Sequence, residues 1–232
     1  MWLKCLADLI FPRKCEICGR LLTGDERYIC EDCMEDMPLT YYWDWPENPA
    51  EKKLWVRTHL HRVIPLFFYT RESRYITLIH KIKYQGKAHL GHYMGFMLGE
   101  KLRGVLSDVD YVVPIPLHPI RRWRRGYNQA EIIAGGVTEA LFGKEKAKLH
   151  LRCDILKRGR YTRTQTRRKM ADKWSNVADA FRVRTTERLS GKHILIIDDV
   201  LTTGSTAEAA YTALTKVCKD CKISFATLGY VE

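Results

Sequence analysis

Two adjacent acids stand directly before a run of hydroxyl side chains in the stretch Ile194–Thr206, ILIIDDVLTTGST. Asp198 and Asp199 are of a type that accepts hydrogen bonds from sugar hydroxyls or holds Mg²⁺ through water. Backbone N–H groups and hydroxyls at the start of a helix favour an anion such as phosphate. That role is predicted for Thr202, Thr203, Gly204, Ser205 and Thr206. Gly204 also permits backbone angles that other residues resist.

The residues around this stretch predict the elements that would position it. Ile194–Ile197 is an uninterrupted apolar run, typical of a strand buried on both faces of a parallel sheet. The following AEAAYTALTKV predicts a helix with one apolar stripe. Ligands of open α/β sheets bind beyond the carboxyl ends of the strands, where the two acids would lie.

Two other interpretations of the acids remain open. The first is an ordinary Asp N-cap that follows a buried strand. The second is a Walker B strand, which also ends in acids. The sequence contains neither G-x-x-x-x-G-K-[ST] nor G-x-G-x-x-G, so an NTPase or a dinucleotide-binding protein lacks its main support.

Four cysteines near the N-terminus form two C-x-x-C pairs with eleven residues between them. Cys15, Cys18, Cys30 and Cys33 have the spacing of a closed, tetrahedral and therefore structural zinc site. Disulfides or free thiols are the alternative, and the lack of a secretory signal argues against disulfides. Cys218 and Cys221 have no second pair nearby and are interpreted as ordinary cysteines.

Length and composition indicate a globular chain. Its 232 residues suffice for one sizeable core and a small appendage. No run of about 18 apolar residues occurs, so no membrane span is expected, and we expect a cytoplasmic location. The formal net charge of +12 suits a polyanionic partner, either nucleic acid or a polyphosphorylated small molecule.

Two basic segments carry much of this charge. A cationic loop with Arg121, Arg122, Arg124 and Arg125 is predicted between a strand at Tyr111–Ile115 and a helix. It is interpreted either as a phosphate-binding loop or as a solvated basic turn. Residues 157–181 are long, polar and cationic without a clear period, which is typical of a mobile loop.

Five stretches, in this order and spacing, resemble the ComF/GntX family. They are FPRKCEICG, HKIKYQGK, PIPL with RRGYNQAE, TQTRRKMADKWSNVADAF and IDDVLTTGST. The resemblance covers nearly the whole chain. It implies an α/β fold with a mainly parallel sheet flanked by helices, similar to type I phosphoribosyltransferases, and a small N-terminal four-cysteine zinc module.

The resemblance also implies roles for residues. In type I phosphoribosyltransferases the two acids bind the ribose hydroxyls of phosphoribosyl pyrophosphate (PRPP), and the next loop binds its 5-phosphate. By position, Asp198 and Asp199 would be the catalytic acids, with Mg²⁺ accompanying PRPP, and Thr202–Thr206 would hold the phosphate. The pyrophosphate would lie near Arg125 and a second loop formed by Pro114, Ile115, Pro116, Leu117 and His118.

Two functions from different classes follow. One is a phosphoribosyltransferase that transfers the phosphoribosyl group to an unidentified acceptor. The other is a non-catalytic protein that retains the PRPP pocket and handles single-stranded DNA, or a scaffold for other competence proteins, since the family is associated with natural competence. The expected DNA contacts are Arg121, Arg122, Arg124, Arg163, Gln165, Arg167, Arg168 and Lys169.

The expected domain organisation has three parts. Residues 1–40 would form a leading helix and the zinc module, residues 41–62 a connector, and residues 63–232 the phosphoribosyltransferase-like domain.

Overall fold

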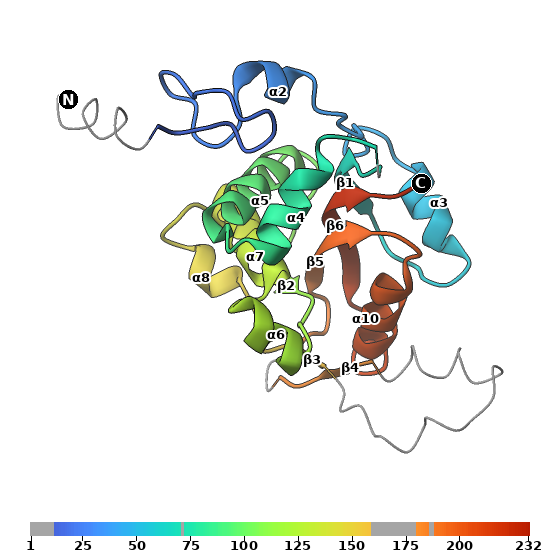
Figure 1. The fold of residues 1–232 in the computed structure, drawn as a ribbon. Helices are drawn as coiled ribbons and strands as arrows, with labels where there is room; N and C mark the ends of the chain where they lie inside the picture. The colour runs from blue at the N-terminus through green and yellow to red at the C-terminus, as the bar shows by residue number, and fades with distance from the viewer. Residues whose placement is uncertain (1–11, 71, 159–179, 186–187) are drawn as a thin grey trace, which may run out of the picture.

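The computed structural model describes residues 12–70, 72–158, 180–185 and 188–232. Its centre is a four-stranded parallel sheet with the strand order β1-β6-β5-β2. The strands are β1 (Val63–Phe68), β6 (Lys222–Tyr230), β5 (His193–Leu201) and β2 (Tyr111–Pro114). Helices lie on both faces of this sheet (Figure 1). The expected fold class, a mainly parallel sheet flanked by helices, is therefore confirmed.

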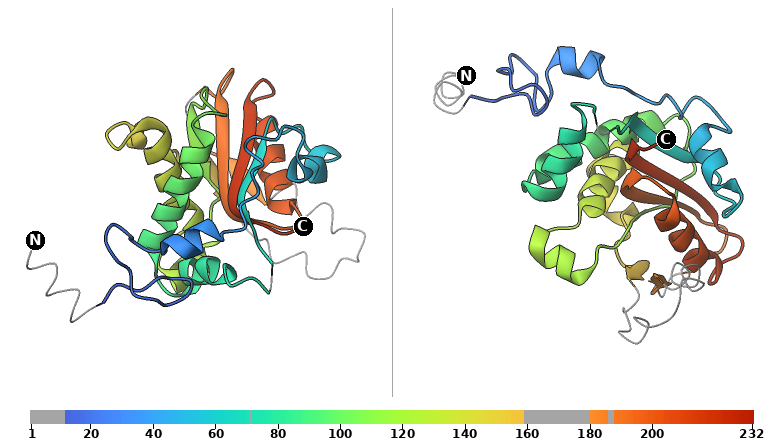
Figure 2. Two further views of the ribbon diagram at one scale, coloured as in Figure 1. Left: turned by 90° about the horizontal axis from the view of Figure 1, so that it is seen from above. Right: turned by 45° about the vertical axis from the view of Figure 1, so that its right-hand side comes forward.

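Each face of the sheet has its own set of covering elements (Figures 1 and 2). One face packs against α4 (Ile76–Tyr84), α5 (Ala88–Leu102) and α7 (Gln129–Phe142). The other packs against α3 (Pro49–Trp55), α10 (Ser205–Thr215) and a small antiparallel pair, β3 (Leu156–Arg158) with β4 (Phe181–Val183). The remaining described elements are three short helices, α2 (Glu31–Glu35), α6 (Pro119–Arg125) and α8 (Ala147–His150).

Strand β5 is buried on both faces, as its apolar run predicts. Leu195 and Ile197 join the hydrophobic cluster on the α4–α5–α7 side, whereas Ile194 and Ile196 join the cluster on the α3–α10 side. Successive side chains of a strand point to opposite faces. The two acids that continue this strand therefore leave the sheet on opposite sides.

The pattern of residues 73–102 predicts two helices with a break near Gly86. The structure has these helices, α4 and α5, with the break at Gly86 (φ +69°). Helix α5 then packs closely against α7. A Cβ atom on Gly95 or Gly136 would meet the backbone of the opposite helix, so both positions need glycine. The Tyr127 hydroxyl, two residues before α7, donates to the Ile82 carbonyl and fixes the start of α7 next to the end of α4.

The prediction of a cationic loop is wrong, because residues 119–125 form helix α6 (Pro119–Arg125). Pro119 occupies a first-turn position, the His118 ring accepts the Ile120 N–H at 3.3 Å, and Gly126 ends the helix in a left-handed conformation. The segment 41–62 contains α3, which begins at the cap Asn48.

Two other expectations fall on residues outside the described ranges. They are the leading helix, expected before Pro12, and most of the basic segment 157–181. Within the described ranges, no helix combines the length and the apolar character that crossing a bilayer requires.

Candidate functional site

Four cysteine thiols meet at one point of the N-terminal module. The Sγ atoms of Cys15, Cys18, Cys30 and Cys33 all lie within 4.8 Å of one another. Zinc with Zn–S bonds of about 2.3 Å needs Sγ–Sγ distances of roughly 3.8 Å, and the Sγ atoms of Cys18 and Cys30 are 3.7 Å apart. The N–H groups of Ile17 and Cys30 donate to Cys15 Sγ at 3.5 and 3.4 Å, which favours a thiolate. The ligand set and its geometry fit structural zinc.

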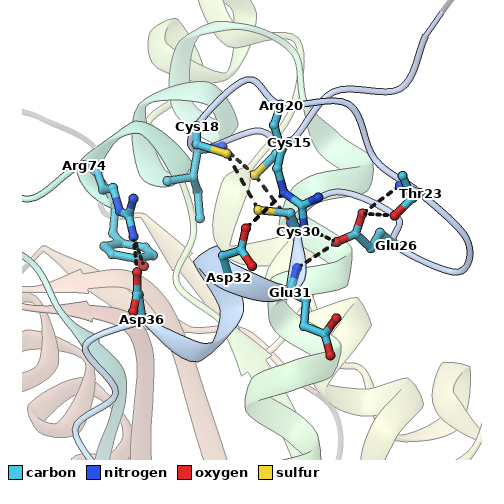
Figure 3. A network of polar contacts seen from close by, with 12 residues as sticks. Cys15, Cys18, Arg20, Thr23, Glu26, Cys30, Glu31, Asp32, Asp36 and Arg74 are labelled. Carbon is cyan, nitrogen blue, oxygen red and sulfur yellow. Dashed lines mark hydrogen bonds and ion pairs between the residues drawn. The ribbon is translucent and has the colours of Figure 1, made fainter.

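A polar network supports the loop between the two cysteine pairs (Figure 3). The Glu26 carboxylate accepts the N–H groups of Thr23 and Glu31 at 2.7 and 2.8 Å. It also pairs with Arg20 at 2.7 Å, and Arg20 reaches Asp32 at 3.3 Å. These bonds hold the second cysteine pair at the start of α2.

The cysteine module is attached to helix α4 and the start of α5. Glu16, inside the first C-x-x-C pair, makes ion pairs with Lys81 at 2.9 Å and Lys87 at 3.0 Å. The Tyr75 hydroxyl donates to the Cys33 carbonyl at 3.0 Å. Buried cysteine side chains also join the hydrophobic cluster on this face of the sheet. A displaced module would therefore disturb α4.

The two acids lie on β5 itself and not in a loop after it, because the strand continues to Leu201. Both side chains are partly buried. The N–H of Asp199 donates to the Asp198 carboxylate at 2.8 Å. On the α4 side of the sheet, Lys83 Nζ lies 2.9 Å from Asp199 Oδ1. The charges of the two acids and of Lys83 therefore influence one another, and Lys83 is paired with Asp199.

Burial raises the pKa of Asp198 to about 7, and the neighbouring Asp199 carboxylate adds to the increase. The Asp199 N–H and the positive charges of Lys83 and Arg158 act in the opposite direction. Carboxylate oxygens are the ligands that Mg²⁺ prefers in proteins. A cation that binds Asp198 would displace its proton, and one that binds Asp199 would displace the lysine.

A hydroxyl-rich turn follows β5 and leads into α10, a helix of eleven residues. Thr202 and Thr203 are exposed, whereas Gly204 is buried and has φ +82°. Helix α3 supports the turn from behind. Arg57, just after α3, donates to the Thr203 carbonyl at 2.7 Å, and a Cβ on Gly204 would lie 2.2 Å from Leu54 Cδ2. The turn is held rigidly with its hydroxyls outward, as anion binding requires.

The segment Pro114–His118 begins beside the acids, because β2 pairs with β5. The Ile115 N–H donates to the Ile197 carbonyl at 2.8 Å. From the other side, the Asn128 side chain donates to the Ile115 carbonyl at 3.0 Å and also caps α7. The structure therefore brings the segments Pro114–His118 and Thr202–Thr206 to the carboxyl end of the sheet.

A cationic hollow of about 450 Å³ lies between the end of α4 and α6. Its lining residues are Lys83, Tyr84, Gly86, Arg121, Arg124 and Arg125. The Arg125 guanidinium stacks over Tyr84, with 5.0 Å to the ring centre. Arg122 does not line the hollow and instead approaches Glu131 at 3.6 Å. Three of the four arginines expected to contact phosphate therefore converge.

The remaining predicted contacts, Arg163, Gln165, Arg167, Arg168 and Lys169, lie outside the described residues. Conversely, the structure adds Lys83, Arg57 and Asn128 to the site. HKIKYQGK and RRGYNQAE carry two of them, so the motifs contained a usable signal. No local pattern marks Arg57.

A second polar cluster lies near the amino-terminal ends of the central strands β5 and β6. His193 Nδ1 lies 2.8 Å from Asp108 Oδ1, and His193 Nε2 lies 2.8 Å from Ser224 Oγ. These distances resemble a hydrolase triad, but Ser224 is fully buried and His193 is 2% exposed. A nucleophile needs access to substrate, so this cluster is a structural link between β5 and β6.

Comparison with known proteins gives two results. Residues 6–42 match the family model described as Double zinc ribbon domain. The match covers the cysteine cluster and agrees with its geometry.

Relatives also match the larger part of the chain. It is 27% identical over 209 residues to DNA utilization protein YhgH of Escherichia coli K12, covering 86% of this chain and 83% of that protein. The Salmonella typhimurium protein of the same name is 26% identical over 206 residues, with the same two coverages. Competence protein F of Haemophilus influenzae is 28% identical over 146 residues, covering 60% of this chain and 61% of that protein. The alignment with the Haemophilus protein thus spans less than two thirds of its length. These homologues confirm the resemblance stated from the sequence.

Proposed function

We propose that this relative of Competence protein F and of the DNA utilization proteins binds Mg²⁺-PRPP at the carboxyl end of the sheet and acts in DNA handling. One observation carries the proposal. The acid pair on β5 lies between a hydroxyl-rich turn suited to one phosphate and a cationic hollow suited to another. PRPP has this same order of groups, with a phosphate at C5, ribose hydroxyls in the middle and a diphosphate at C1.

Each part of PRPP would be bound by a different set of residues. Thr202–Thr206 would take the 5-phosphate, Asp198 and Asp199 the ribose hydroxyls, and Pro114–His118 with Arg125 the diphosphate. Mg²⁺ would supply positive charge next to the diphosphate. Transfer to an acceptor would break the bond from C1 to the diphosphate oxygen and form one from C1 to the acceptor. Fixed cations near the departing diphosphate would stabilise its charge.

Calorimetric titration with Mg²⁺-PRPP tests this proposal. The wild-type chain should bind, and the double variant Asp198→Ala/Asp199→Ala should lose at least about 100-fold in affinity. It loses hydrogen bonds between charged groups and hydroxyls, each worth about 1.5–3 kcal/mol. The control is Asp25→Ala/Asp36→Ala, which removes the same charge at two exposed positions of the zinc module. Equal affinity in the acid-pair variant and in the wild type would refute the assignment.

We also propose single-stranded DNA as a ligand of α6, and a specific observation favours it. Trp123 is 86% exposed and Ile120 is 65% exposed, one turn apart, among exposed arginines. An exposed tryptophan beside arginines offers a base a stacking surface and its phosphates a cationic path. This use of α6 accords with the name of the DNA utilization relatives.

Fluorescence anisotropy with a labelled oligothymidine tests α6. We expect binding that weakens steeply with salt, because phosphate contacts release counterions. Trp123→Ala should weaken it by roughly 5- to 100-fold, since stacking contributes about 1–3 kcal/mol per base. The matched control is Trp55→Ala, which removes another exposed tryptophan from α3. The proposal is wrong if no binding occurs at low salt or if both variants behave alike.

A further inference from the structure

Lys83 contacts the acid pair and also lines the cationic hollow. It lies in the last turn of α4, and its Nζ is 2.9 Å from Asp199 Oδ1, with 20% of the lysine side chain and 18% of the aspartate side chain exposed. The same lysine lines the cationic hollow. Lys83 is therefore paired with one of the two acids and also lines the hollow together with three arginines.

Among the described residues that line the hollow, one is a lysine, three are arginines and none is acidic. Arg125 is partly balanced by the Gln129 amide oxygen at 2.9 Å and by the Tyr84 ring. Pairing Lys83 with Asp199 draws one positive charge away from its like-charged neighbours. The pair thus suits a site without ligand.

A ligand that uses Asp199 competes with this pair. A ribose hydroxyl or a cation at Asp199 must first displace Lys83, and an ammonium left without a partner beside three arginines is unfavourable. An anion in the hollow removes this cost, because it pairs with the Lys83 ammonium group in place of Asp199. A sugar phosphate with a second anionic group at C1 supplies this anion, whereas a plain sugar phosphate does not.

We propose that Lys83 is a specificity-determining residue that selects sugar phosphates carrying a diphosphate at C1 over simple sugar phosphates. The inference rests on the proposed PRPP site and assigns its selectivity to one side chain. Lys83 pairs with Asp199 until a diphosphate in the hollow takes over the ammonium group. It acts on binding and forms no covalent bond.

Calorimetry with two probes, Mg²⁺-PRPP and ribose 5-phosphate, tests the inference on the full chain. The wild type should prefer Mg²⁺-PRPP. Lys83→Met should weaken Mg²⁺-PRPP at least tenfold and leave ribose 5-phosphate unchanged or bound up to about fivefold more tightly, because Asp199 is released. Lys83→Arg should keep the preference.

The control variant is Lys87→Met, which removes the same charge four residues away, where Lys87 pairs with Glu16 and does not line the hollow. It should keep the wild-type ratio of the two affinities. Thermal unfolding should verify that each variant folds. If Lys83→Met does not fold, the wild type provides the test, because saturating Mg²⁺-diphosphate should then raise its affinity for ribose 5-phosphate.

The outcomes separate the two proposals. If the wild type binds neither probe, the proposed function fails and this inference fails with it. If the wild type binds both probes and Lys83→Met changes both equally or changes neither, the PRPP site stands and Lys83 is not the selecting residue. If only the wild type can be used, its affinity for ribose 5-phosphate is measured with saturating Mg²⁺-diphosphate. An unchanged or lower affinity would also show that Lys83 is not the selecting residue.

Discussion

Removing the metal from the four-cysteine cluster should unfold the N-terminal module and lower the unfolding temperature of the chain by about 10 °C or more. The cluster joins two C-x-x-C pairs whose loop has only a small polar network and a few buried side chains to hold it. Folding energy from the metal replaces the core that so short a segment cannot build. Because Glu16 and Cys33 attach the module to α4, the loss should extend into the larger domain.

Zinc content and thermal unfolding, measured on the same samples, provide the test. Wild-type protein should contain about one zinc per chain, and a strong chelator or Cys30→Ser should remove it together with the stability. Cys153→Ser is the control, since it replaces a partly buried thiol outside the cluster. A chelated protein that keeps the wild-type unfolding temperature would show that the cysteines need no metal.

Gly204→Ala should lower the free energy of unfolding by roughly 2–5 kcal/mol and abolish binding of ribose 5-phosphate. The backbone at Gly204 has φ +82°, which costs any L-residue about 1–2 kcal/mol. The new methyl group would also stand 2.2 Å from Leu54 Cδ2, and overpacking of this kind typically costs about 1–3 kcal/mol. Relief requires the turn or α3 to move, and either movement disturbs the hydroxyls that face the phosphate.

Gly126→Ala separates these two costs. Gly126 has nearly the same backbone angles as Gly204, with φ +79° and ψ −22° against φ +82° and ψ 0°, but no described atom lies within 4 Å of its added Cβ. Urea unfolding of both variants should therefore show a smaller loss for Gly126→Ala, and calorimetry should show wild-type binding of ribose 5-phosphate. Equal losses in the two variants would mean that the contact with Leu54 contributes nothing.

The sequence predicts the central features of this fold because they depend on local patterns. The apolar run Ile194–Ile197, the glycine break between α4 and α5 and the C-x-x-C spacing each follow from neighbouring residues. Helix α3 had a local signal as well. Asn48 accepts the Glu51 N–H at 3.0 Å and Pro49 occupies the first turn, which is the pattern of a helix start.

The rest of the site depends on contacts between distant segments. The pairing of Lys83 with Asp199 joins positions 116 residues apart by number, and it exists because α4 packs on the face toward which Asp199 points. Arg57 reaches Thr203 only because α3 lies behind the turn. Neither relation has a local pattern, since each follows from strand order and from which face a helix covers. The roles assigned to Asp198 and Asp199 in PRPP binding remain predictions.

The strand order also determines when this pocket can be completed during translation. Strand β6 follows all the other described strands along the chain, yet it lies between β1 and β5. Strand β1 and helix α3 therefore cannot join the sheet until β6 has left the ribosome, and without α3 the Gly204 turn has no support. A nascent chain exposes one edge of β5 until then, which is the kind of surface that chaperones cover. The ligand site thus forms only after nearly every residue described has been synthesised.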